Sequence, residues 1–170
     1  MPLLRLSWVR GAVGRDGGPR DEAEVMTIYT IGFQGKTAEE FFEALKGAGI
    51  RRLIDVRLRN DSHLAGFARR VHLEYLLKEI CGADYMHEPL LAPTDEILDS
   101  WRAKTLPWDE YEKRFGALLK EREVEQAIDR SVFSVPSVLL CSEPRADKCH
   151  RRLVADYLAG KWGGVEVKHL

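Results

Sequence analysis

Side chains that can do chemistry are concentrated in one short stretch, residues 141–151, with the sequence CSEPRADKCHR. Cys141 ends an apolar run typical of a buried strand, and Cys149 and His150 begin a predicted helix. The first turn of a helix has free N–H groups and the positive end of the helix dipole, which together lower the pKa of a nearby thiol. The pattern therefore predicts a reactive site in which Cys141 or Glu143 is the reactive group and His150 carries the proton.

Two arginines are candidates for holding an anionic ligand beside that site. Arg151 lies in the first turn of the predicted helix, where backbone N–H groups also favour phosphate or carboxylate. Asp55 and Arg57 lie two positions apart in a predicted strand and therefore share one face of it. We expect Arg57 and Arg151 to bind the anion and Asp55 to orient an arginine or bind a ligand hydroxyl. A purely structural Asp55–Arg57 ion pair is the alternative.

Three further residues are predicted to contribute to ligand binding. Ser62 lies in the polar loop of residues 60–63, His87 ends a short predicted strand, and Cys149 lies beside His150. The histidines and cysteines show no recognised metal-ligand spacing, and the chain has no CxxC pair. We therefore expect no metal and no cofactor.

The elements that must position these residues alternate between strands and helices. Strand patterns cover residues 27–33, 51–58, 83–89, 137–141 and 165–170, and helical patterns cover residues 38–49, 71–81, 94–129 (broken near Pro107) and 149–161. Thr37 and Glu40 form a capping box at the start of the first helix. This order predicts an α/β fold with an open, mostly parallel sheet flanked by helices. In such folds, ligands bind outside the carboxyl ends of the strands, which selects residues 32–36, 55–67 and 141–151.

Composition limits the broad class of the protein. The chain has 170 residues, 45% of them hydrophobic, and a formal charge of −1. We expect one compact domain at residues 26–170, with a flexible extension at residues 1–25. The near-neutral charge argues against nucleic-acid binding through overall charge, and no apolar run reaches the roughly 18 residues of a membrane span. Three cysteines, an odd number, favour a reducing, cytoplasmic location.

The order of the motifs TIGF, LIDVR, YMHEP, CSEP and CHRRL resembles the domain of unknown function 488 family over residues 27–170. The resemblance implies an α/β fold and intracellular bacterial or archaeal proteins, and it implies no established reaction. Leu58-Arg59-Asn60 stands where many members carry a proline, and Leu91-Ala92-Pro93 where a glycine pair is common. These departures indicate a distinct subgroup.

A looser likeness in layout is to rhodanese and protein tyrosine phosphatase sites, where a strand-end Cys leads through a loop to Arg at a helix start. Here nine residues separate Cys141 from Arg151, and the charge of Glu143 opposes an anionic substrate.

We expect a pocket that binds or transforms a small phosphate-bearing or nucleotide-like ligand. The alternatives are a non-catalytic ligand-binding or nucleic-acid-associated module, rhodanese- or phosphatase-like thiol chemistry at Cys141, and a purely structural polar network. Whether the protein is an enzyme, and its oligomeric state, stay open at this point.

Overall fold

The strands form one parallel sheet. The computed structural model describes residues 25–61, 63 and 65–170, so the expected flexible extension lies outside the described residues except for Val25. Within this part the sheet has five strands in the order β3-β2-β4-β1-β5, and every neighbouring pair is parallel. The strands are β1 (Met26–Gly32), β2 (Arg52–Asp55), β3 (Asp84–His87), β4 (Ser137–Cys141) and β5 (Val165–His169). The predicted α/β class is confirmed.

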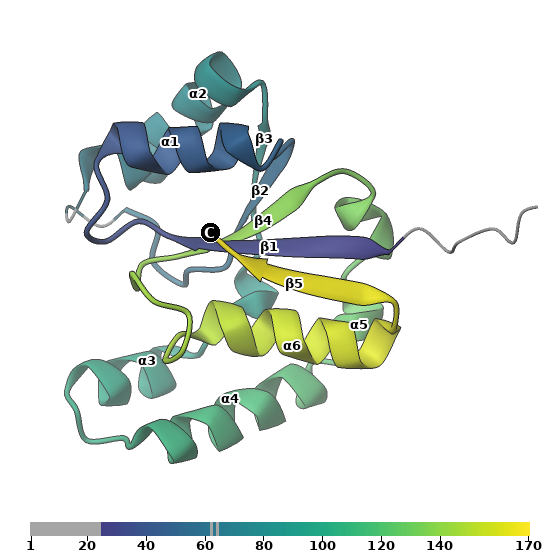
Figure 1. Cartoon of the computed structure of the whole chain (residues 1–170). Helices are drawn as coiled ribbons and strands as arrows, with labels where there is room; N and C mark the ends of the chain where they lie inside the picture. Colours follow the sequence, from purple (N-terminus) through teal and green to yellow (C-terminus); the bar gives the residue numbers. More distant parts are fainter. Residues whose placement is uncertain (1–24, 62, 64) are drawn as a thin grey trace, which may run out of the picture.

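Helices cover both faces of this sheet (Figure 1). On one face lie α1 (Ala38–Gly47) and α2 (Arg70–Leu76), the latter continuing as a π-helical turn (η2, Leu77–Cys81). On the other lie α3 (Asp95–Arg102), α4 (Trp108–Glu121), α5 (Val124–Ala127) and α6 (His150–Trp162). Short 3₁₀ turns occupy Gly66–Ala68, Pro89–Leu91 and Arg130–Phe133. The predicted capping box is present, since Thr37 Oγ1 accepts from the Glu40 N–H at 3.1 Å and Glu40 Oε2 accepts from the Thr37 N–H at 2.7 Å.

Alternation along the strands divides the apolar core into two layers. Ile28, Ile54 and Leu139 pack with residues of α4 and α6, whereas the intervening side chains, such as Val138 and Leu140, pack with α1 and α2. Successive side chains of a strand point to opposite faces. Cys141, two residues after Leu139, therefore belongs to the face covered by α4 and α6.

The chain leaves two neighbouring strands, β2 and β4, in opposite directions. After β2 it runs to α2 on one face, and after β4 it runs to α6 on the other. Such a change of direction opens a crevice at the carboxyl ends of the two strands, which is where open α/β sheets bind ligands. The fold thus places the segment after Asp55 beside the segment after Cys141.

The second strand is shorter than its sequence pattern predicts. It ends at Asp55 because the Asp55 carboxylate accepts a hydrogen bond from the backbone N–H of Arg57 at 3.1 Å, which turns the chain out of the sheet. The break near Pro107 is confirmed, since α3 ends at Arg102 and α4 begins at Trp108. None of the described helices is both long and apolar enough to cross a membrane.

Candidate functional site

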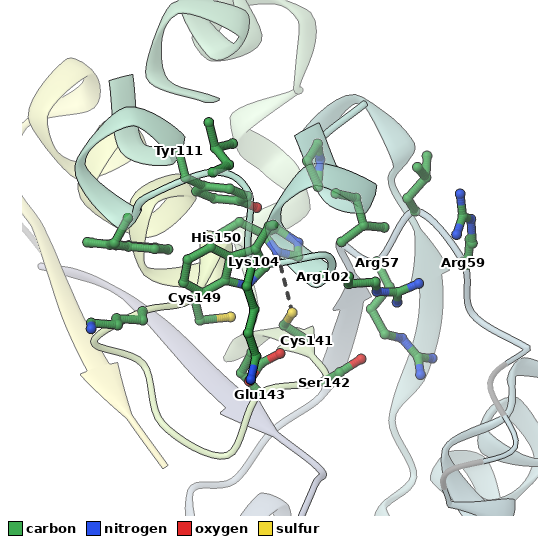
Figure 2. Close-up of a pocket in the computed structure, with 17 residues that line it drawn as sticks. Arg57, Arg59, Arg102, Lys104, Tyr111, Cys141, Ser142, Glu143, Cys149 and His150 are labelled. Atoms are coloured by element: carbon green, nitrogen blue, oxygen red, sulfur yellow. Dashed lines mark hydrogen bonds between the residues drawn. The ribbon is translucent and has the colours of Figure 1, made fainter. Parts of the chain in front are cut away.

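A pocket of about 440 Å³ opens at the crevice between β2 and β4 (Figure 2). It brings together Arg57, Cys141, Glu143, Cys149 and His150, five of the residues singled out in the sequence. Buried side chains form its floor, among them both cysteines and His150, and exposed side chains form its rim. The α3–α4 connection supplies the wall opposite the two strand ends.

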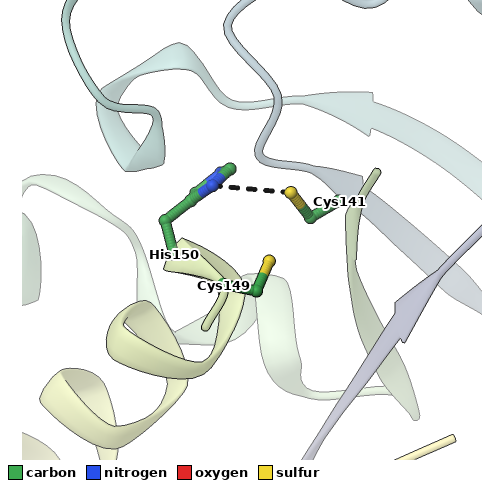
Figure 3. Close-up of side chains that lie close together, drawn as sticks. All are labelled: Cys141, Cys149 and His150. Atoms are coloured by element: carbon green, nitrogen blue, oxygen red, sulfur yellow. Dashed lines mark hydrogen bonds between the residues drawn. The ribbon is translucent and has the colours of Figure 1, made fainter. Parts of the chain in front are cut away.

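Cys141 and His150 form a hydrogen-bonded pair at the floor of the pocket (Figure 3). Cys141 Sγ lies 3.4 Å from His150 Nδ1, and His150 Nε2 lies 2.8 Å from the carbonyl oxygen of Val56. A carbonyl can only accept, so Nε2 carries the proton and Nδ1 presents its lone pair to the thiol. The edge-to-face contact with Phe115, at 5.6 Å between ring centroids, also holds the imidazole. His150 is thereby oriented to take the thiol proton.

The surroundings of Cys141 favour its thiolate. Burial raises the pKa of the Cys141 thiol, but the Cys149 S–H, the backbone N–H groups of Glu143 and Ser142, and the charge of Arg151 outweigh it, leaving the pKa below its ordinary value. Burial raises the pKa of Cys149 well above its ordinary value, and its hydrogen bond to Cys141 adds to this. Of the two thiols, Cys141 is therefore the more readily deprotonated.

Hydrogen bonds from the end of β1 and from α6 hold the loop after β4 in place. The backbone N–H of Gln34 donates to the Ser142 carbonyl at 3.0 Å, and Arg151 Nη1 donates to the Glu143 carbonyl at 2.6 Å. Gly32 permits this approach, because a Cβ at that position would lie 1.7 Å from the Glu143 carbonyl oxygen. Arg151 is 1% exposed and does not line the pocket, so its placement supports a role in positioning the loop rather than the predicted direct contact with an anion.

Asp55 and Arg57 form a buried, bidentate ion pair. Arg57 Nε and Nη2 donate to the two carboxylate oxygens of Asp55 at 2.7 and 2.6 Å, and the Tyr85 hydroxyl donates to the same carboxylate at 2.7 Å. Asp55 does not line the pocket; it orients Arg57, which does. Arg57 is 3% exposed, and its Nη1 atom is buried without a hydrogen-bond partner among the described residues. The ion pair therefore leaves one buried guanidinium nitrogen of this pocket-lining residue without a hydrogen bond.

Of the two other predicted ligand-binding residues, one does not line the pocket and the other lies outside the described residues. His87 Nε2 donates to the carbonyl of Arg57 at 2.8 Å, so His87 helps to fix the backbone of Arg57. His87 itself does not line the pocket. Ser62 lies outside the described residues.

The sequence patterns did not identify the aromatic wall or most of the cationic rim. Trp101 and Trp108 pack on the core, as expected of helical aromatics, but they also line the pocket together with the buried Tyr111. Trp108 stacks on Tyr111 with 5.2 Å between ring centroids. The two tryptophans flank the helix break near Pro107. The exposed cations of the rim are Arg59, Arg102, Lys104 and Lys148.

The pocket floor also contains a set of donors suited to a thiophilic metal ion. One ligand atom each of Cys141, Cys149 and His150 lies within 4.8 Å of the others. Two thiolates and an imidazole nitrogen are ligands that Zn²⁺ prefers, and a ligating histidine commonly donates its other N–H to a carbonyl, as His150 does to Val56. These three residues can therefore hold such an ion, although the expectation of no metal stays a prediction.

Comparison with known families agrees with the motifs carried by this pocket. The model of the family described as domain of unknown function DUF488 matches residues 37–158. The chain belongs to the DUF488 family. The match includes Asp55, Arg57, Cys141, Cys149 and His150, so the resemblance predicted from the motifs is confirmed. Searches of curated proteins and of solved structures gave no significant match. The description of DUF488 assigns no reaction, so the functional argument depends on the geometry of the pocket.

Proposed function

We propose that this protein is a thiol-dependent enzyme that acts on a small anionic, ring-bearing ligand of the nucleotide-like class. The observation that carries the proposal is the position of Cys141 Sγ, 3.4 Å from an oriented His150 Nδ1 at the floor of an open pocket. His150 takes the proton from Cys141, and the thiolate forms a bond to an electrophilic atom of the ligand. As the bond to the leaving group breaks, His150 returns the proton to it, and a second nucleophile later releases the thiol.

The distribution of charge indicates how such a ligand is oriented. Among the described residues, Arg102, Lys104 and Lys148 at the rim form no ion pair, whereas Arg59 is engaged with Asp95 and Asp99. The floor contains the thiols, with the carboxylate-bearing Glu143 beside them. An anionic group is therefore favoured at the rim, and the reacting atom of the ligand at the floor.

This orientation differs from the phosphatase layout, in which the phosphate itself sits at the thiolate. Arg151, the counterpart in layout of a phosphatase arginine, is occupied by backbone carbonyls of its own loop: Nη1 donates to Glu143 at 2.6 Å and Nη2 to Pro144 at 3.5 Å. Its side chain is 1% exposed and lies outside the pocket lining. We infer that the anionic group of the ligand binds the cations at the rim and is not the group that the Cys141 thiolate attacks.

The walls suit a flat ring. Trp101 and Trp108 meet edge to face at 5.4 Å between centroids and, with Tyr111, present aromatic surface to the cavity. A volume of about 440 Å³ lies within the range of small-molecule sites, roughly 300–1,000 Å³. Aromatic side chains contact rings edge to face as well as by stacking, and rim cations bind phosphate through charge. These features together favour a nucleotide-like ligand over a bare inorganic anion.

The test of the reactive group is the alkylation rate of each cysteine by iodoacetamide as a function of pH, read by peptide mass. We expect Cys141 to react at a pH below the ordinary thiol value of about 8.5, and His150→Gln to slow the reaction at neutral pH. Cys81 is an internal control, because burial raises its pKa. If Cys141 and Cys149 are both inert in the native protein but react after unfolding, the proposal is wrong.

The ligand class is tested by titrating the protein with nucleoside phosphates and measuring the change in its tryptophan fluorescence, to which Trp101 and Trp108 of the pocket contribute. Removing two exposed cations, each worth about 0.5–1 kcal/mol, in the double variant Lys104→Ala, Lys148→Ala should weaken binding about 5- to 30-fold. Lys113→Ala is the matched control, because Lys113 is exposed on α4 but outside the pocket lining. Equal loss in both variants would show non-specific attraction rather than a site.

A further inference from the structure

The second cysteine of the pocket, Cys149, forms no covalent bond in the proposed reaction, although it lies against the reactive one. Cys141 and Cys149 are 4% and 2% exposed, both line the pocket, and their Sγ atoms are within 4.8 Å of each other (Figure 3). The third cysteine, Cys81, lies in the π-helical turn on the other face of the sheet, with its Sγ 3.9 Å from the Phe42 carbonyl oxygen. Only Cys149 among the described cysteines is therefore placed to react with Cys141.

We propose that Cys141 and Cys149 form a reversible dithiol–disulfide couple, in which Cys149 resolves the sulfenic acid that forms when Cys141 reduces a hydroperoxide. This inference rests on the proposed function, because it uses the same reactive thiolate. It adds a second activity, the two-electron reduction of a peroxide bond, and gives Cys149 a role that nucleophilic attack on the anionic ligand does not require.

The proposed redox cycle is balanced when a peroxide is the oxidant and a small thiol is the reductant. The Cys141 thiolate attacks one oxygen of ROOH, the O–O bond breaks, and the leaving alkoxide takes a proton from His150 to give ROH and Cys141–SOH. Cys149–SH then attacks the sulfenic sulfur, releasing water and forming the Cys141–Cys149 disulfide. Two molecules of a low-molecular-mass thiol reduce this disulfide and leave as their own disulfide.

The local backbone leaves Cys149 free to make this bond. Cys149 is the N-cap residue of α6, with φ −140° and ψ 139°, and its side chain forms no capping hydrogen bond. Turning the side chain toward Cys141 therefore breaks no helix cap. The two sulfurs already lie within 4.8 Å of each other. A disulfide requires the sulfurs to close to about 2.05 Å, and the open pocket gives a small peroxide access to the floor.

The experiment treats the full-length reduced protein with one equivalent of cumene hydroperoxide and maps its cysteines by peptide mass. The wild type should lose two hydrogens, yield a peptide linked through Cys141 and Cys149, and return to the dithiol form with glutathione. Cys149→Ser should instead accumulate a Cys141 sulfenic acid that dimedone traps. Cys81→Ser is the matched control and should behave as the wild type.

The outcomes separate this inference from the proposed function. If Cys141 alkylates rapidly but the wild type accumulates the same dimedone adduct as Cys149→Ser, the resolving role of Cys149 is overturned and the nucleophile stands. If Cys141 is inert to both iodoacetamide and peroxide, both proposals fail. If the purified protein contains stoichiometric zinc, and a chelator must remove it before either thiol reacts, the three donors form a metal centre and the dithiol couple is overturned.

Discussion

Substituting Gly32 by alanine tests whether β1 positions the reactive loop. An alanine Cβ would lie 1.7 Å from the Glu143 carbonyl oxygen, 2.7 Å from the Glu143 carbonyl carbon and 3.0 Å from Arg151 Nη1. No side-chain rotation relieves a clash with backbone, so the loop must move away from β1. This movement breaks the bond from Arg151 to Glu143 and strains the bond from Gln34 to Ser142.

These contacts give the expected loss in the free energy of unfolding and the expected change in the pKa of Cys141. Overpacking costs about 1–3 kcal/mol, and losing a hydrogen bond to a charged group costs about 1.5–3 kcal/mol. A loss of about 3 kcal/mol in the free energy of unfolding should lower Tm by about 6–12 °C for a domain of this size. The moved loop also takes the Glu143 N–H away from the Cys141 sulfur, so the pKa of Cys141 should rise and its alkylation at neutral pH should slow.

The assay is a thermal melt together with the pH profile of Cys141 alkylation. Gly47→Ala is the matched control: nothing lies within 4 Å of a Cβ built there, and the residue ends α1 far from the loop. That variant should keep the wild-type alkylation profile and gain slightly in stability. A Gly32→Ala protein with wild-type Tm and an unchanged alkylation profile would refute the idea that close approach to β1 holds the loop.

Three other predictions concern the groups around the pocket. Asp55→Ala leaves Arg57 buried without its counter-charge and should lower the free energy of unfolding by about 3–5 kcal/mol in urea denaturation; a loss below about 1 kcal/mol would show that the pair is not needed for stability. Cys149→Ala removes the S–H group that lowers the pKa of Cys141 and should move the midpoint of its alkylation profile to higher pH; a midpoint that stays or falls contradicts the assigned donor. Lys104 has φ 58°, a left-handed conformation that asparagine adopts more easily. Lys104→Asn should therefore raise Tm slightly, and it should weaken nucleoside phosphate binding because it removes a rim cation. A lower Tm would argue against backbone strain at this position.

The fold and the strand-end part of the site were predictable for one physical reason. Alternating strand and helix patterns require parallel strands, and parallel strands bring their carboxyl ends to one edge. Arg57, Cys141 and Glu143 lie just after or at strand ends, so the sequence already placed them together. The Thr37 capping box was predictable as well, because its two hydrogen bonds are local and depend only on a three-residue spacing.

The remainder of the site depends on tertiary packing that no local pattern encodes. Cys149, His150 and Arg151 are consecutive, but each residue of a helix is rotated by about 100° from the one before. Only the packing of α6 against β1 and β4 decides that His150 faces the pocket and Arg151 faces the loop carbonyls. The long connection from β3 to β4 folds back over the strand ends, so Trp101 and Trp108 reach the pocket across a sequence distance that periodicity cannot bridge.

The buried charges bear on the deprotonation of Cys141. Asp55, Arg57 and Arg151 are the buried residues of fixed charge in the described part of the chain. Asp55 neutralises Arg57, whereas Arg151 is surrounded by the carbonyls of Glu143 and Pro144 and the hydroxyl of Thr30, with no carboxylate partner among the described residues. A buried, unpaired guanidinium is costly. Burial raises the pKa of the Cys141 thiol, and the charge of Arg151 is one of the effects that outweigh it. A thiolate at Cys141 would therefore supply a negative charge near a buried guanidinium that has no carboxylate partner among the described residues.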